Sequence, residues 1–149
     1  MPWSVNGEQI SLPVLTQLAL AEKVVIDMTN PLNADWSPLS LGADNSAGEE
    51  TAKALPESYV VKAFNTIFAD MMAPEKLASL AVKPAGFYCG NDVAAKAKVS
   101  QLLATAGFDP IDAGSIGGAR YLEQMAHLNI RLALSVENGT QAAFSYHRI

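Results

Sequence analysis

The chain has 149 residues, 50% of them hydrophobic and 17% charged, which favours one globular domain with a substantial core. Its net charge of −5 argues against a nucleic-acid-binding surface, because such a surface needs a basic face. No apolar run approaches the roughly 20 residues of a membrane span, and no signal peptide is visible. The single cysteine, Cys89, excludes an internal disulfide. We therefore expect a cytoplasmic protein without membrane segments.

The first strong strand is predicted within Lys23–Leu32, sequence KVVIDMTNPL. Its apolar residues run into an Asn-Pro pair, and a short apolar run bounded by turn residues is typical of a buried strand in a parallel sheet. Upstream of it, two alternatives stay open. Ser11 caps a short helix that reaches Leu18, or the chain is extended up to Pro13.

The rest of the chain alternates helices and strands. A long loop over Asn33–Asn45 precedes a capping box at Ser46–Glu49, which predicts a surface helix that ends at Pro56. The further elements are predicted in the order strand Tyr59–Phe64, helix Ile67–Met72, helix Pro74–Leu80, strand Gly86–Gly90, helix from Asn91 or Asp92 to Gly107, edge strand Phe108–Gly114, helix Ala119–Val136, and a tail Ala142–Ile149 that is a strand or an ordered end. This pattern predicts an α/β fold in one domain, residues 1–149.

Common catalytic and phosphate-binding motifs are missing from the sequence. A dinucleotide site usually shows G-x-G-x-x-G after the first strand, and Gly114–Gly118 (GSIGG) has the wrong spacing and follows the last strand. His127 and His147 do not have the spacing of metal ligands, so we expect no metal site. We expect His127 to be a partly buried or surface residue.

The cysteine and two of the aspartates could also take part in chemistry. Cys89, at the end of an apolar strand, is expected to be a small core residue. Asp27 and Asp112 each lie near a strand end and could form a carboxylate pair, but we favour a role in binding loop backbone N–H groups.

Polar groups gather where two of the predicted strands end. Thr29-Asn30-Pro31 follows the first strand and Phe64-Asn65-Thr66 follows the second. In open α/β sheets, ligands bind beyond the carboxyl ends of the strands. Hydroxyls, amides and an aromatic ring suit a planar heteroaromatic ligand with a ribose, and hydride transfer between two cofactors needs mainly such orientation. The alternative, that Asn30 and Asn65 only stabilise turns, stays open.

Motifs in a fixed order carry a family resemblance across nearly the whole chain. They are Pro2-Trp3, Ile26–Leu32 (IDMTNPL), Ser46 with Leu55-Pro56, Val60–Thr66 (VVKAFNT), Phe87–Asp92 (FYCGND), Gly107-Phe108, Asp112–Gly114, Ala119-Arg120 with Leu122-Glu123, and Gly139-Thr140 with Ala143-Phe144. In these motifs the chain resembles the NADP-binding domain of the deazaflavin (coenzyme F-420)-dependent NADP reductases, and the STEAP-type metalloreductases are similar. The resemblance implies an incomplete, C-terminal part of a Rossmann-type, mostly parallel sheet with flanking helices and a long C-terminal helix.

The resemblance also implies a function. It predicts an NADP-dependent oxidoreductase that transfers hydride between a nicotinamide and a flavin or deazaflavin acceptor, with no residue acting as acid or base. The residues that it places around the nicotinamide are Pro2, Trp3, Thr29, Asn30, Pro31, Phe64 and Asn65, with Ala63 and Thr66 as weaker candidates.

The family's first three strands and glycine-rich turn have no counterpart in the sequence. We therefore expect a shortened form in which dinucleotide binding is weak or absent, unless Met1 is an internal start and the missing strands are encoded upstream. The alternative function is a non-catalytic half-Rossmann protein that binds a small ligand or assembles with a partner chain. A shortened sheet would expose Val24–Thr29 as an apolar edge, so we expect a homo-oligomer that covers it.

Overall fold

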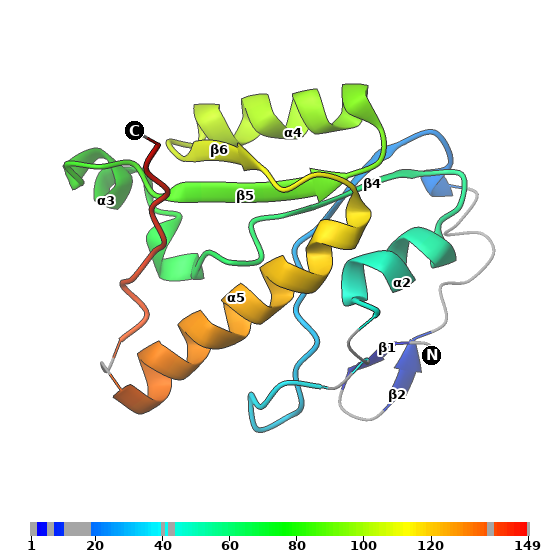
Figure 1. Cartoon of the computed structure of the whole chain (residues 1–149), viewed down its shortest axis with the longest axis horizontal. Helices are drawn as coiled ribbons and strands as arrows, with labels where there is room; N and C mark the ends of the chain where they lie inside the picture. Colours follow the sequence, from blue (N-terminus) through cyan, green and yellow to red (C-terminus); the bar gives the residue numbers. More distant parts are fainter. Residues whose placement is uncertain are drawn as a thin grey trace.

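The computed structural model describes residues 3–5, 8–10, 19–39, 41, 44–136 and 139–148, the first two ranges by their backbone. A four-stranded sheet in the order β3-β4-β5-β6 lies at the centre of the described part (Figure 1). Its strands are β3 Val24–Asp27, β4 Tyr59–Ala63, β5 Ala85–Gly90 and β6 Asp109–Asp112. The pairs β3–β4 and β5–β6 are parallel, whereas β4 and β5 are antiparallel. The predicted mostly parallel Rossmann-like sheet is thus confirmed, with one antiparallel pair in its middle.

Helices cover both faces of this sheet. Their bounds are α2 Ala47–Ala54, α3 Pro74–Ser79, α4 Val93–Thr105 and α5 Ala119–Arg131, with short 3-10 turns η1 Ala69–Met71 and η2 Ile116–Gly118 and a π-helical end η3 Leu132–Val136. Helix α4 lies on one face, and α2 and α5 lie on the other (Figure 1). In the described part of the chain, no helix has the length and apolar character that crossing a membrane requires.

Each face of the sheet has its own hydrophobic core, because side chains alternate along a strand. On the α4 side, Val61 and Ala63 of β4 pack with Val99 and Leu103 of α4. On the α5 side, Phe87 and Cys89 of β5 pack with Ala119 and Leu122. The two faces of β4 therefore differ: Val61 and Ala63 point to α4, and Lys62 between them points to α2 and α5.

Capping residues explain where the predicted helices begin and end. Ser46 Oγ accepts a hydrogen bond from the Glu49 N–H, and Asp92 Oδ1 accepts one from the Ala95 N–H, so both predicted caps are confirmed. Helix α4 is followed by Gly107, whose φ of +98° favours glycine.

Several boundaries differ from those predicted. The predicted helix Ile67–Met72 is only the short turn η1. The apolar residues Leu102, in α4, and Ala106, directly after it, recur at helical spacing with buried residues of this helix but are exposed. The long last helix changes to π-helix at Leu132 before it ends. The tail is an ordered end without secondary structure, in which the Phe144 carbonyl accepts from the Ala85 N–H.

The start of the chain forms a separate element. Strands β1 Trp3–Val5 and β2 Glu8–Ile10 pair antiparallel in a two-stranded sheet of their own. The open question of a helix from Ser11 to Leu18, or extended chain up to Pro13, concerns residues outside those described.

Candidate functional site

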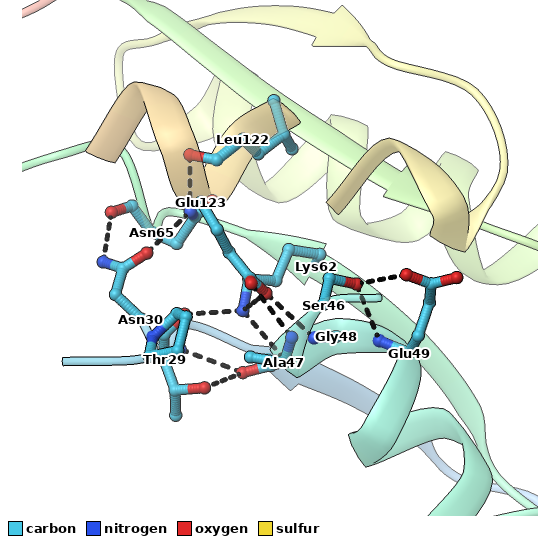
Figure 2. Close-up of polar contacts among 12 residues, drawn as sticks. Thr29, Asn30, Ser46, Ala47, Gly48, Glu49, Lys62, Asn65, Leu122 and Glu123 are labelled. Carbon is cyan, nitrogen blue, oxygen red and sulfur yellow. Dashed lines mark hydrogen bonds and ion pairs between the residues drawn. The ribbon is translucent and has the colours of Figure 1, made fainter. Parts of the chain in front are cut away.

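The ends of β3 and β4 meet through an asparagine pair. Asn30 Nδ2 donates to the Asn65 carbonyl at 2.8 Å, and Asn65 Nδ2 donates to Asn30 Oδ1 at 3.0 Å and to the Leu122 carbonyl at 3.1 Å (Figure 2). Both partners of Asn65 Nδ2 are acceptors, so the orientation of this amide is fixed. Asn65 Oδ1 is then a buried acceptor without a hydrogen-bond partner among the described residues. We call Thr29–Pro31 and Asn65–Thr66 together the rim.

Thr29 is held on its backbone and on its side chain. Asp27 Oδ1 accepts from the Thr29 N–H at 2.9 Å and from Thr29 Oγ1 at 2.7 Å. The Thr29 carbonyl accepts from Lys62 Nζ at 2.5 Å. The predicted role of Asp27 in binding loop backbone groups is therefore confirmed.

A buried ionic cluster lies under the rim. Lys62, with no exposed surface, forms an ion pair with Glu123 Oε1 at 2.9 Å (Figure 2). It also donates to Asp27 Oδ2 at 3.0 Å. Asp27 and Lys62 meet because they are register partners in the parallel pair β3–β4. Glu123 also accepts from the N–H groups of Ala47 and Gly48, both at 2.9 Å, so it satisfies free donors at the positive N-terminus of α2.

Helix α5 contacts the rim through further polar side chains on its buried face. His127 Nε2 lies 3.1 Å from the Pro31 carbonyl, and Asn129 Nδ2 donates to the Thr66 carbonyl at 3.2 Å. A carbonyl can only accept, so His127 carries its proton on Nε2 and leaves Nδ1 as a buried acceptor, without a partner among the described residues. Burial lowers the pKa of His127, which keeps the ring neutral.

A cavity of about 350 Å³ opens beside the rim. Its lining is mainly apolar, with a few polar groups, as is common for small-molecule sites. Residues from the rim, from its flanking loops and from α5 line it: Asn30, Leu32, Trp36, Asn65, Thr66, Ile67, Phe68, Ala69, Asp70, Ala126, Asn129, Ile130 and Thr140. Trp36 and Ile130 also border a second cavity of about 510 Å³, which His127 and Arg131 line.

Trp36 lines both cavities and has an unusual backbone conformation. It is 61% exposed and has a φ of +67°, in the left-handed region. Its loop imposes that conformation, because the Trp36 N–H donates to the Asn33 carbonyl, and the Asn33 N–H donates to the Ser37 carbonyl. Leu32 and Pro38 form a β-bridge that closes the loop.

The predicted nicotinamide residues are placed as follows. The structure brings Thr29, Asn30, Pro31 and Asn65 together at the rim, with Thr66 beside them. The Phe64 ring instead lies edge-on to Phe108 in the core on the α4 side, with centroids 6.2 Å apart, and Ala63 is fully buried there. Pro2 lies outside the described residues, and Trp3 is described only by its backbone in β1.

Asp27 and Asp112 do not form a carboxylate pair. They lie on the two outer strands of the described sheet, three strand spacings apart, or about 14 Å. Asp112 accepts from the Gly114 N–H and pairs with Lys96, so it too binds loop backbone. Cys89 is a core residue, as predicted, and burial raises the pKa of its thiol to about 12.

Sequence reasoning missed three residues that shape this region, Lys62, Glu123 and Trp36. The first two have a readable signal. Lys62 interrupts an otherwise apolar strand, and Glu123 falls on the apolar face of α5 next to Leu122. Trp36 lies in an irregular loop, and nothing in the loop sequence indicates that its ring borders a cavity.

Comparisons with known proteins identify relatives that are similar to this chain in sequence. No family model matches the chain. The rat metalloreductase STEAP3 is 34% identical over 105 residues, which are 70% of this chain and 20% of that protein. Human metalloreductase STEAP2 is 32% identical over 107 residues, 71% of this chain and again 20% of the relative. The chain therefore matches about a fifth of the length of these metalloreductases.

Solved structures share the fold. A candidate coenzyme F-420-dependent NADP reductase from Arthrobacter sp. FB24 has a TM-score of 0.80 and 33% identity, covering 90% of this chain and 61% of that chain. A hypothetical protein from Sinorhizobium meliloti has a TM-score of 0.58 and 28% identity, covering 69% and 51%. These matches confirm the resemblance that the order of motifs predicts: the chain is similar in sequence to part of the STEAP metalloreductases, and in sequence and in fold to the candidate coenzyme F-420-dependent NADP reductase.

Proposed function

We propose that the rim and its cavity hold the nicotinamide ring of NADPH for hydride transfer to a flavin or deazaflavin acceptor. The observation that carries the proposal is Asn65 Oδ1, a buried acceptor without a described partner on a residue that lines the cavity. Leaving such an atom unsatisfied costs about 1–3 kcal/mol, so a ligand that offers an N–H group gains by binding it. The carboxamide of nicotinamide offers such a group.

The surrounding residues fit a planar, partly apolar ring. Trp36 and Phe68 give the cavity aromatic surface, and Ile67, Ala126 and Ile130 give it aliphatic surface that excludes water. Thr29 and Asn30 come from the neighbouring strand end and keep Asn65 in place.

In this proposal the protein orients and the cofactor reacts. When bound, reduced nicotinamide supplies the hydride, and a flavin-type ring accepts it. Asn65 fixes the ring by its amide, and the cavity walls shield the ring from water. No side chain has to donate or remove a proton in the hydride transfer itself.

The experiment titrates the protein with NADPH and with reduced nicotinamide mononucleotide, and follows the fluorescence of the reduced ring. The mononucleotide contains the part of the cofactor that the cavity is proposed to hold. We expect both to bind with a Kd of about 1 mM or below, and NADPH to reduce flavin mononucleotide catalytically. A folded protein that binds neither ligand at millimolar concentration would rule the proposal out. Binding without flavin reduction would favour the alternative, a ligand-binding protein without catalysis.

A matched pair of variants locates the binding. Ala69 is exposed and lines the cavity, so Ala69→Trp should fill the cavity and weaken binding of the mononucleotide at least about tenfold. Ala104 is exposed on α4, on the opposite face of the sheet, so Ala104→Trp should leave the Kd unchanged. Equal effects of the two substitutions would place the ligand elsewhere.

A further inference from the structure

Lys62 is the most completely enclosed charged group of the described residues. Its side chain has no exposed surface, and its ammonium group contacts Asp27 Oδ2 at 3.0 Å, Glu123 Oε1 at 2.9 Å and the Thr29 carbonyl at 2.5 Å (Figure 2). The contacts with Asp27 and with the Thr29 carbonyl are hydrogen bonds, and the contact with Glu123 is an ion pair. Lys62 is therefore inaccessible to any ligand and can act only through its neighbours.

The contact with Thr29 connects Lys62 to the rim. Asp27 and Lys62 together hold the N–H, the hydroxyl and the carbonyl of Thr29, so this residue has no freedom to rotate. Asn30 follows directly and forms the reciprocal amide pair with Asn65. The position of Asn65, whose Oδ1 is proposed to bind the ligand, thus depends on a chain of contacts that begins at Lys62.

Stability alone does not explain the buried charges of Asp27, Lys62 and Glu123. A buried ion pair gains little over apolar residues of similar volume, because each charge loses its hydration. Here one ammonium group faces two carboxylates, and the N-terminus of α2 supplies the remaining positive potential at Glu123 through the Ala47 and Gly48 N–H groups. Such an arrangement fixes the position of the ammonium group between β3, β4, α2 and α5.

The far edge of the sheet contains an exposed version of the same arrangement. After β6, Asp112 accepts from the Gly114 N–H, and Lys96 donates to Asp112 and to the Gly114 carbonyl at 3.2 Å. The contacts match those of Asp27, Thr29 and Lys62, except that Asp112 and Lys96 are partly exposed. None of the residues that line the two cavities beside the rim lies in this second loop, so it provides an internal control.

We propose that Lys62 is a positioning residue for the ligand site: its ammonium group fixes Thr29 and, through Asn30, the amide of Asn65. Glu123 and α2 hold Lys62 in place from the other side. This inference rests on the proposed function for its ligand, but the ordering of the rim can be measured without any ligand.

The test is a charge-free cluster, Lys62→Met with Asp27→Asn and Glu123→Gln. Lys62→Met alone would leave two buried carboxylates together at a large cost in stability, which the two amide substitutions avoid. The asparagine at position 27 would keep an acceptor for the Thr29 N–H and hydroxyl, and the glutamine at position 123 would keep an acceptor for one of the two α2 N–H groups, of Ala47 or Gly48. The change therefore removes the ammonium contact with Thr29 together with one hydrogen bond at the N-terminus of α2. The matched control is Lys96→Met with Asp112→Asn, which makes the equivalent change at the exposed loop.

Hydrogen exchange and the midpoint of thermal unfolding are measured first, in the free protein. We expect the charge-free cluster to unfold at a similar temperature, while the Thr29 backbone amide and the Asn65 side-chain amide exchange at least about tenfold faster and amides of β5 and α4 do not change. The control should leave the rim amides unchanged. Unaltered exchange at Thr29 and Asn65 in the charge-free cluster would overturn the proposal. So would equal acceleration of exchange throughout the sheet, because that would show a role in stability alone.

Ligand affinity is the second readout. If the protein binds reduced nicotinamide mononucleotide, the charge-free cluster should weaken binding about tenfold with little change in unfolding temperature. If the unaltered protein does not bind it, the proposed function fails, and the exchange rates at the rim still decide the role of Lys62.

Discussion

The amide of Asn65 illustrates how single residues specify this site. Its NH₂ group is enclosed by two acceptors, Asn30 Oδ1 and the Leu122 carbonyl, and its own oxygen is left over. The sequence indicated that Asn30 and Asn65 lie at neighbouring strand ends, and left open whether they stabilise turns or bind a ligand. The structure shows that their NH₂ groups stabilise the rim, while Asn65 Oδ1 is buried and has no hydrogen-bond partner among the described residues. No sequence pattern distinguishes the two atoms of one amide.

His127 couples protonation to stability. Burial lowers its pKa in the folded protein below the value of about 6.5 in the unfolded chain. The neutral ring therefore stabilises the fold above pH 6.5, and this contribution is lost as the pH falls through the lower pKa of the folded state.

The pH dependence can be assigned with the two histidines of the chain. We expect the free energy of unfolding in urea to fall less between about pH 7.5 and pH 5.5 in His127→Gln than in the unaltered protein. The glutamine amide of this variant could still donate to the Pro31 carbonyl but would not titrate. His147 is exposed, so His147→Gln should behave like the unaltered protein. The same loss of stability in all three proteins would contradict the assignment.

At the scale of elements, helix α5 contacts several parts of the site. Leu122 and Ala126 lie on its buried face, and Ala133 of η3 is buried as well, whereas the neighbouring Leu132 is exposed. The same face also carries Glu123 and His127, which contact α2 and Pro31. A helical period predicts which side of a helix is buried, but the polar contacts depend on which loops lie opposite, and that is decided by the sheet order.

The close approach of α2 to α5 requires a glycine at position 48. A Cβ at Gly48 would lie 2.8 Å from the Ala119 Cβ and 3.4 Å from the Lys62 Cδ. Gly48→Ala should therefore destabilise the protein by about 1–3 kcal/mol in urea unfolding, although alanine is otherwise the better helix former.

Gly117→Ala is the control for this substitution. A Cβ at Gly117 would meet only Ser115 Oγ at 3.6 Å, an ordinary contact, so the free energy of unfolding should change much less. If Gly48→Ala were as stable as the unaltered protein, the packing of α2 on α5 would be looser than described.

At the scale of the whole molecule, the sequence predicted the strands and the fold class well, because short apolar runs between turn residues are strong signals. The exception in the sheet, the antiparallel β4–β5 pair, has no local signal, since strand direction depends on the path of the connection between them. Strand β3, Val24–Asp27, lies at the edge of the described sheet, within the predicted edge Val24–Thr29. A homo-oligomer that covers this edge stays a prediction.

The rim and its cavity are proposed to bind a nicotinamide ring. The most direct test is a titration with reduced nicotinamide mononucleotide, followed by amide nitrogen–proton NMR spectra of the unaltered protein. We expect saturable shifts of the Asn65 and Asn129 side-chain amides and of the Trp36 indole, with none in α4. Shifts confined to other surfaces, such as the hollow between Asp109–Ile111 and Arg148, or no shifts at millimolar ligand, would contradict it.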